Sequence, residues 1–211
     1  MKILHIQPLA IPDVKVVRFG RFRDERGYFV ESFRKSDMQG NCYDRCFEGV
    51  EFLQTNESYS HAGVVRGLHF QWNPRMGKLV RTLVGRMVDL VLDIRKGSPY
   101  FGKIIAYDMP VSRDADYGEW IWVPPGFAHG NFFPEPSQIE YSCSGEYSPG
   151  CEAGISPLTR DLDWSLCDPA LKVQFDQIAG SGILSSKDRD GLTLSAWRSD
   201  MRSDNFVFGQ C

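Results

Sequence analysis

The sequence predicts an all-β fold, either a β-sandwich or a β-barrel, from its length and its residue pattern. A chain of 211 residues fits one domain that can bury a sizeable core. From Val64 to about Cys143, short strand-like segments alternate with turn residues, which is typical of these folds. We expect one domain over residues 1–211, with a β-core over about 20–165 and a C-terminal appendage over about 166–211.

Alternation and turn residues define the expected strands in chain order. Apolar residues at even positions from Val88 to Ile94 alternate with Asp89, Val91 and Asp93, which is the period-two signature of a half-buried strand. The segment 78–84 precedes this strand, and Gly85 marks a tight turn between them. Further strands are expected over residues 101–107, 120–123, 129–133 and 138–143, separated by turns rich in Gly and Pro.

The segment after Cys143 has a different character. It is rich in Gly, Pro and Ser, and turns are expected at 148–150 and at Asp168-Pro169. A weak helical pattern follows over about 192–201. We therefore expect this part of the chain to be an appendage to the β-core.

Charge and hydropathy exclude two classes of partner. Acidic residues outnumber basic ones 27 to 24, a net charge of -3, which argues against duplex nucleic acid. No window approaches the roughly 18 consecutive apolar residues of a membrane span. The apolar N-terminal stretch is interrupted by His5, Gln7 and Pro8 and lacks the form of a signal peptide, so we expect a cytoplasmic protein.

The cysteines are expected to be reduced thiols. Their spacing contains no C-x-x-C pair, and no histidine lies near enough to complete a zinc site. A cytoplasmic protein of this size rarely uses disulfides. The six are Cys42, Cys46, Cys143, Cys151, Cys167 and Cys211.

Two of the four histidines, His69 and His129, lie among small residues that leave room for a ligand. Alternation along a regular strand places His69 on one face with Gly67 and Gln71, and it places Arg66 on the other. A metal site on such a strand needs a His-x-His pair, but Gln71 stands where the second histidine belongs. We therefore expect no bound metal.

Acid–base chemistry by side chains is the alternative, because the ordinary pKa of histidine lies near neutrality. Such chemistry needs an orienting group, an acid and a cation, for which Asp188, Tyr141 and Lys78 are candidates. Residue pattern alone also allows structural roles: a core tyrosine, a solvated aspartate and a buried structural histidine.

Six strings resemble, in the same order, motifs of the dTDP-4-dehydrorhamnose 3,5-epimerase family over about residues 8–195. They are 24–31 (DERGYFVE), 66–71 (RGLHFQ), 77–81 (GKLVR), 87–102 (MVDLVLDIRKGSPYFG), 124–130 (PPGFAHG) and 185–188 (SSKD).

This resemblance implies a cupin-type jelly-roll β-barrel with short, mainly C-terminal helices. It further implies a homodimer, no metal or organic cofactor, and a nucleotide-diphosphate-sugar substrate. The implied reaction inverts C3 and C5 of a 4-keto-6-deoxyhexose, typically dTDP-4-dehydro-6-deoxy-D-glucose.

The family motifs assign roles to individual residues. They imply His69 as the base, Asp188 as its orienting carboxylate, Tyr141 as the acid and Lys78 near the keto oxygen. The positions expected to line the nucleotide-sugar cleft are Arg26, Phe29, Glu31, Gln54, Asn56, Arg66 and His129.

Departures from the family pattern lie around the sugar and the C-terminal segment. Ser142 follows Tyr141 where the family often has Lys, residues 156–159 replace a common W-N-D-P, and residues 171–183 form a longer segment than usual. A C3-only or C5-only epimerase, or a ketoisomerase, is therefore the alternative. In a non-catalytic binding protein of this fold we would expect His69, Asp188 or Tyr141 to be lost, whereas all three are present.

Overall fold

The structure, a computed structural model, describes residues 1–40 and 47–210, so Cys42, Cys46 and Cys211 lie outside the described residues. The first strands and the short helix are β1 (Ile3–Pro8), β2 (Lys15–Gly20), β3 (Phe22–Asp24), β4 (Gly27–Phe29) and α1 (Lys35–Gly40). The central strands are β5 (Gln54–Ser60), β6 (Val65–Gln71), β7 (Lys78–Val84), β8 (Arg86–Asp93), β9 (Ile104–Pro110), β10 (Tyr117–Val123), β11 (Phe127–Phe132), β12 (Ser137–Cys143) and β13 (Glu152–Gly154). The C-terminal elements are α2 (Pro169–Ser181), α3 (Ser186–Arg189), α4 (Leu194–Ser199) and the 3₁₀ helix η2 (Met201–Asn205).

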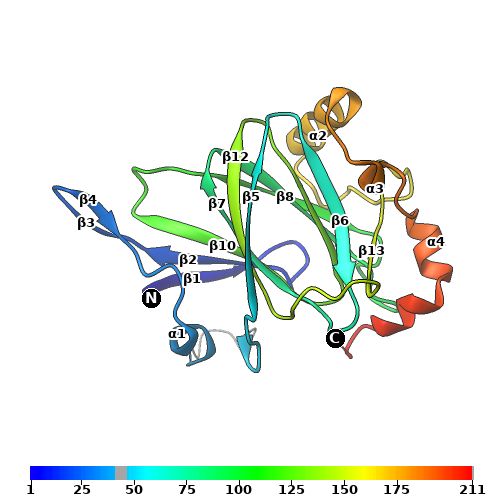
Figure 1. Ribbon diagram of the computed structural model, residues 1–211, viewed down its shortest axis with the longest axis horizontal. Coiled ribbons are helices and arrows are strands. Elements are labelled where there is room, and N and C mark those ends of the chain that lie inside the picture. The colour runs from blue at the N-terminus through cyan, green and yellow to red at the C-terminus, as the bar shows by residue number, and fades with distance from the viewer. Residues whose placement is uncertain (41–46, 211) are drawn as a thin grey trace.

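Two antiparallel sheets form the body of the molecule, as Figure 1 shows. One has the strand order β1-β2-β10-β7-β12-β5, and the other has the order β13-β6-β11-β8-β9. Sequence neighbours are often separated within a sheet, so the chain passes from one sheet to the other as in a jelly roll. The predicted all-β, cupin-type jelly-roll class is confirmed.

β8 is buried on both faces, whereas alternation predicts a half-buried strand. Its even-numbered residues, such as Leu90, pack in a cluster with the C-terminal segment, including Trp197 and Phe206. Its odd-numbered residues, such as Val91, pack in the interior cluster between the two sheets. Asp89 is fully buried with this second set, so the expected solvent-facing polar face does not exist.

The C-terminal segment is more helical than the sequence suggests. Asp168-Pro169, expected to form a turn, begins α2: the Asp168 side chain accepts a hydrogen bond from the backbone N–H of Ala170, and Pro169 occupies the first turn. The phenyl ring of Phe175, from α2, packs against that of Phe132 on β11. The helices therefore cover the outer face of the five-stranded sheet (Figure 1).

The boundaries of the core differ from those expected. β1 and most of β2 lie before residue 20 and belong to the six-stranded sheet, and Val16 and Val17, adjacent on β2, pack in apolar clusters on its two faces. The strand expected over 101–107 begins only at Ile104, after a turn that contains Gly102.

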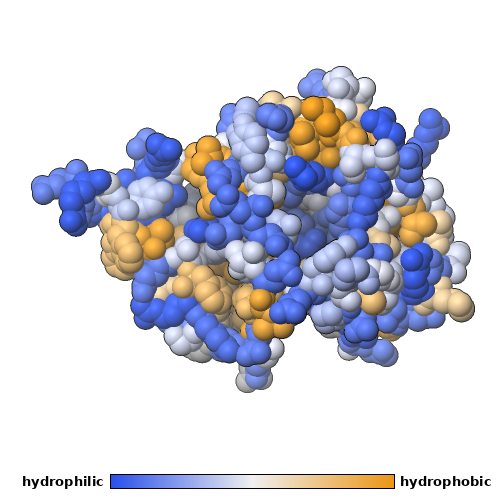
Figure 2. Space-filling view, viewed as in Figure 1, coloured by the Kyte–Doolittle hydropathy of each residue, from blue (hydrophilic) through white to orange (hydrophobic). Residues whose placement is uncertain are grey.

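A small hairpin of β3 and β4 projects from the body at the left of Figure 1. Its residues are exposed, including the aromatic ring of Phe29, which is 66% exposed. In Figure 2 its tip is hydrophilic. Among the described residues, no helix is long and apolar enough to cross a membrane.

A substitution at Trp197 tests whether the C-terminal segment is part of the core. Its side chain is fully buried, with its ring centroid 4.5 Å from that of Phe70. We expect Trp197→Ala to lower the free energy of unfolding by about 3–5 kcal/mol, because it removes a large apolar contact and leaves a cavity. Chemical denaturation measures this. Met201→Ala is the matched control, since Met201 is 85% exposed, and equal stability of the two variants would contradict the assignment.

Candidate active site

A polar cleft opens between the two sheets and the short helix α3. It comprises two cavities of about 260 Å³ and 390 Å³ that share His69, Lys78 and Tyr141 in their walls. The face seen in Figure 2 is hollowed near its centre, and hydrophilic residues surround the hollow. The cleft therefore brings together side chains from strands far apart in the sequence.

His69 and Asp188 form a hydrogen-bonded pair in this cleft. The imidazole Nε2 of His69, on β6, lies 2.6 Å from Oδ1 of Asp188, on α3. Burial alone would raise the pKa of Asp188, but hydrogen bonds from His69, Ser185 and the backbone of Gly67 outweigh it and hold the pKa below its usual value. Asp188 is thus an anion at neutral pH that fixes the orientation of the imidazole.

A small residue leaves space for that imidazole. Gly154 on β13 pairs with His69 in the sheet, and a Cβ built on Gly154 would lie 3.0 Å from Cδ2 of the ring. A side chain at this position would press on the imidazole.

Arg66 also lines the cleft, although regular alternation predicts that it points away from His69. The reason is a β-bulge: His69 pairs with His129 and Arg66 pairs with Asn131, so two residues of β6 lie opposite one residue of β11 between these pairs. The backbone of Gly67, inside the bulge, has a φ of 113°, which favours glycine. A Cβ on Gly67 would also lie only 2.5 Å from Cα of Gly130.

Lys78 and Tyr141 lie on the opposite sheet, on the neighbouring strands β7 and β12. Burial lowers the pKa of Lys78, while nearby acidic groups, Cys143 first and then Asp89 and Glu152, oppose that effect. Burial also raises the pKa of Tyr141, so its phenol stays protonated at neutral pH. The two groups are thus a cation candidate and a proton-donor candidate.

The expected binding residues Gln54, Asn56 and His129 line the cleft as well. Asn56 pairs with Tyr141 across β5 and β12. The side-chain amide of Gln54 donates a hydrogen bond to Oδ1 of Asn56 over 2.9 Å. His129 holds a second imidazole–carboxylate contact, 2.8 Å from Nε2 to Oδ2 of Asp89.

Three expected binding residues do not reach this cleft in their own chain. Arg26 lies at the tip of the β3–β4 hairpin, where it pairs with Asp24, and Phe29 is exposed on the same hairpin. Glu31 accepts hydrogen bonds from the amino group of Met1 and from Arg34. None of the three lines either cavity.

Several cleft residues were missed by the sequence reasoning. Lys187 adjoins Asp188 in the matched 185–188 string, which is a signal that could have found it, and its Nζ donates to Glu152 over 2.7 Å. Asn131 follows the matched 124–130 string directly, whereas Glu152 has no motif to mark it. Asp89 lies inside the 87–102 string, but alternation assigned it to a solvent-facing side.

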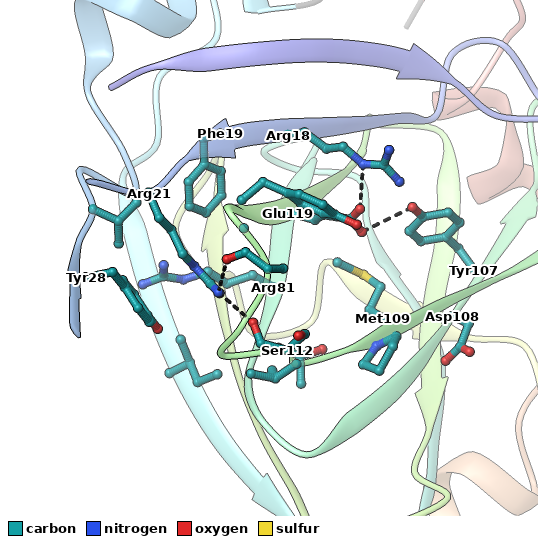
Figure 3. Close-up of a pocket in the computed structure, with 18 residues that line it drawn as sticks. Arg18, Phe19, Arg21, Tyr28, Arg81, Tyr107, Asp108, Met109, Ser112 and Glu119 are labelled. Carbon is teal, nitrogen blue, oxygen red and sulfur yellow. Dashed lines mark hydrogen bonds and ion pairs between the residues drawn. The ribbon is translucent and has the colours of Figure 1, made fainter. Parts of the chain in front are cut away.

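A separate cavity of about 380 Å³ lies toward the other end of β7, near Arg81, Thr82 and Leu83 (Figure 3). Arg18 donates to Glu119 over 2.7 Å, and the hydroxyl of Tyr107 donates to the same carboxylate over 3.1 Å. None of the predicted site residues lines this cavity.

The expected reduced cysteines and the expected lack of a metal site can be compared with the structure. Cys143, Cys151 and Cys167 are free thiols, as expected for these three. Within residues 1–40 and 47–210, no three His, Cys, Asp or Glu side chains gather as a metal ion would require. The absence of a cofactor stays a prediction.

Known proteins resemble this chain in sequence and in fold. A sequence model of dTDP-4-dehydrorhamnose 3,5-epimerases matches residues 8–196. The chain is 39% identical to the dTDP-4-dehydrorhamnose 3,5-epimerase of Shigella flexneri, over 80% of this chain and 91% of that protein. Its match to the Neisseria gonorrhoeae enzyme of that name is 37% identical and covers 87% of this chain but 51% of the relative.

Solved structures agree with these matches. The dTDP-6-deoxy-D-glucose-3,5-epimerase RmlC of Legionella pneumophila, in complex with dTDP-4-keto-L-rhamnose, has a TM-score of 0.78 at 30% identity over 98% of this chain and 99% of that one. ChmJ of Streptomyces bikiniensis, a 3′-monoepimerase in complex with dTDP-quinovose, has a TM-score of 0.74 at 26% identity, over 90% and 88% of the two chains. By family match, sequence identity and fold, the chain belongs to the dTDP-4-dehydrorhamnose 3,5-epimerase family.

Proposed function

We propose that the protein is an isomerase that inverts C3 and C5 of a nucleotide-linked 4-keto-6-deoxyhexose, typically converting dTDP-4-dehydro-6-deoxy-D-glucose to dTDP-4-dehydro-L-rhamnose. One observation carries the proposal: the imidazole and the phenol come from opposite walls of one cleft. His69 lies on the five-stranded sheet and Tyr141 on the six-stranded sheet. Inversion needs removal of a proton on one face of a carbon and its return on the other.

The proposed reaction at each carbon has two proton transfers. His69, held by Asp188, takes the proton from the carbon next to the ketone, and the C–H electrons form an enolate with the C4 oxygen. The ammonium of Lys78 stabilises the developing negative charge; removing one such preorganised donor typically costs about 10²–10³ in rate. The phenol of Tyr141 then protonates the carbon from the other face, which restores the ketone with inverted configuration.

Binding of the diphosphate is assigned to basic side chains at the cleft. Arg66 lines it, and its guanidinium can form paired hydrogen bonds to phosphate oxygens. Its Nε donates to the hydroxyl of Ser60 over 2.9 Å, which holds the side chain in place. Gln54, Asn56 and His129 supply further polar contacts in this proposal.

Deuterium exchange tests the reaction. In deuterated water the protein should introduce deuterium at both C3 and C5 of dTDP-4-dehydro-6-deoxy-D-glucose, followed by NMR. His69→Asn should lower the exchange rate by about 10²–10⁴-fold at both carbons, because it removes the base. Tyr141→Phe should instead retain exchange by His69 while inversion is lost. Exchange that is unchanged in His69→Asn would show that the base is another residue.

Exchange at one carbon only would support the alternative, a single-site epimerase. The fold alone does not separate the two activities, because the similar ChmJ is a 3′-monoepimerase. Exchange at neither carbon would point to another substrate or to a binding protein.

A homodimer completes the proposed site. Arg26 and Phe29 lie on the β3–β4 hairpin, which projects from the body (Figure 1), and neither residue lines the cleft of its own chain. An exposed arginine and an exposed aromatic ring on such an arm can reach the cleft of a second copy, where the guanidinium would meet the diphosphate. Glu31 follows on the segment after this arm.

Mixing two inactive variants tests the shared site. If Arg26 acts in the partner's cleft, hybrid dimers of His69→Asn with Arg26→Ala contain one intact site and one doubly altered site. Activity should therefore reappear on mixing, to as much as about a quarter of wild type when half of all dimers are hybrids. No recovery from exchanging dimers, or a monomeric mass by light scattering, would contradict the arrangement.

The proposed catalytic unit is one domain over residues 1–211, and the proposed location is the cytoplasm. The free thiols of Cys143, Cys151 and Cys167 support a reducing compartment. No cofactor takes part in the proposed steps.

A further inference from the structure

Behind His129, a wall residue of the cleft, lies a buried carboxylate with no role in the mechanism above. Asp89 lies in the middle of β8 and is fully buried, and His129 on β11 is 7% exposed. Their contact, 2.8 Å between Nε2 and Oδ2, is as short as a charge-assisted hydrogen bond. Asp89 thus contacts Nε2 of His129 in the same way that Asp188 contacts Nε2 of His69.

One of the two oxygens of this carboxylate has no hydrogen-bond donor among the described residues. Oδ1 of Asp89 is buried and unpartnered, and so is Oδ1 of Asn131, which pairs with Asp89 across β8 and β11. Two acceptor oxygens cannot hydrogen-bond to each other, so only Oδ2 of Asp89 has a donor, His129, among the described residues, and a charge on this carboxylate acts strongly in a low-dielectric interior.

Lys78 lines the same cavity as His129, the imidazole that Asp89 contacts, and its ammonium is a cation on which this charge acts. Burial lowers its pKa, and negative charge at Cys143 and then at Asp89 opposes the lowering. Burial raises the pKa of the Cys143 thiol, so this group is uncharged at neutral pH and Asp89 is the leading negative charge on Lys78. Lys78 must be an ammonium to stabilise an enolate.

We propose that Asp89 is a positioning residue of this active site: its buried carboxylate fixes the imidazole of His129 and supplies the negative charge that keeps Lys78 an ammonium. The inference rests on the proposed function. As the partner of Nε2, Asp89 makes that nitrogen the donor and leaves Nδ1 of His129 as the nitrogen that can face a ligand.

Other titratable groups surround Asp89 and Lys78 and belong in any account of pH dependence. They are Tyr107 opposite Asp89 on β9, Arg66 and His69 on β6, Tyr141 and Cys143 on β12, Glu152 on β13, and Lys187 and Asp188 on α3. Glu152 is hydrogen-bonded to Lys187, and Asp188 to His69; among the described residues, Asp89 is the carboxylate with a buried oxygen that has no partner.

Asp89→Asn tests the proposal through the pH profile. Loss of the negative charge lowers the pKa of Lys78, so the ammonium is lost at a lower pH. We expect the alkaline limb of the exchange rate to move down by roughly half a pH unit or more. Asp93→Asn is the matched control: Asp93 is equally buried on β8 but pairs with Arg95, so this variant should lose stability and keep the wild-type limb.

A charge swap separates electrostatics from packing. In Asp89→Asn/Asn131→Asp the carboxylate returns to the same pair of cross-strand positions, and the alkaline limb should move back toward that of wild type. This double variant is also the test if Asp89→Asn does not fold. Two results would overturn the proposal. One is a folded Asp89→Asn variant whose alkaline limb lies at the same pH as that of wild type. The other is a folded double variant whose alkaline limb is no closer to that of wild type than the limb of Asp89→Asn.

NMR without substrate distinguishes failure of this inference from failure of the proposed function. The ¹³Cε signal of Lys78 should titrate at lower pH in Asp89→Asn, and the ¹⁵N signals of His129 should lose the fixed Nε2–H tautomer. Both signals unchanged would overturn the role of Asp89 even in an active enzyme. Both changed would support it even if dTDP-4-dehydro-6-deoxy-D-glucose is not the substrate.

Discussion

The hydrogen bond between His69 and Asp188 is the interaction on which the site depends, and it joins two separate parts of the chain. His69 belongs to the five-stranded sheet, whereas Asp188 belongs to a four-residue helix in the C-terminal segment. A helix this short has little stability of its own. Its position follows from the apolar packing of Phe175, Trp197 and Phe206 on the outer face of the sheet. The C-terminal segment is therefore part of the machinery that orients the base.

The same architecture explains why the cleft tolerates so many buried polar groups. A jelly-roll interior presents side chains from both sheets toward one space, so each charged group can have a partner across the gap or along its own sheet. His69 and His129 lie side by side in register on β6 and β11, each with its own aspartate. Val80 and Ile139 belong to the apolar cluster between the two sheets, and Ile139 also lines the cleft.

Much of this could be predicted from the sequence, and the misses share physical causes. Alternation found β7, β8 and β12, because regular strands follow a period of two. It failed at Arg66, where an extra residue in β6 changes the face, and at Asp89, because the face expected to meet solvent lies in the interior between the two sheets while the C-terminal segment covers the other face. Motif resemblance placed His69, Lys78, Tyr141 and Asp188 in one cleft, but no strand or turn pattern reveals that Arg26 lies on a projecting arm.

The bulge in β6 has a consequence for how such a cleft varies. A substitution at one wall position changes one side chain, but a change of one residue in strand length turns every side chain beyond it to the opposite surface. Removing the extra residue would leave His69 facing inward and turn Arg66 outward, toward the C-terminal helices. Single-residue insertions and deletions in β6 would thus change which side chains line the cleft more than amino-acid replacements would.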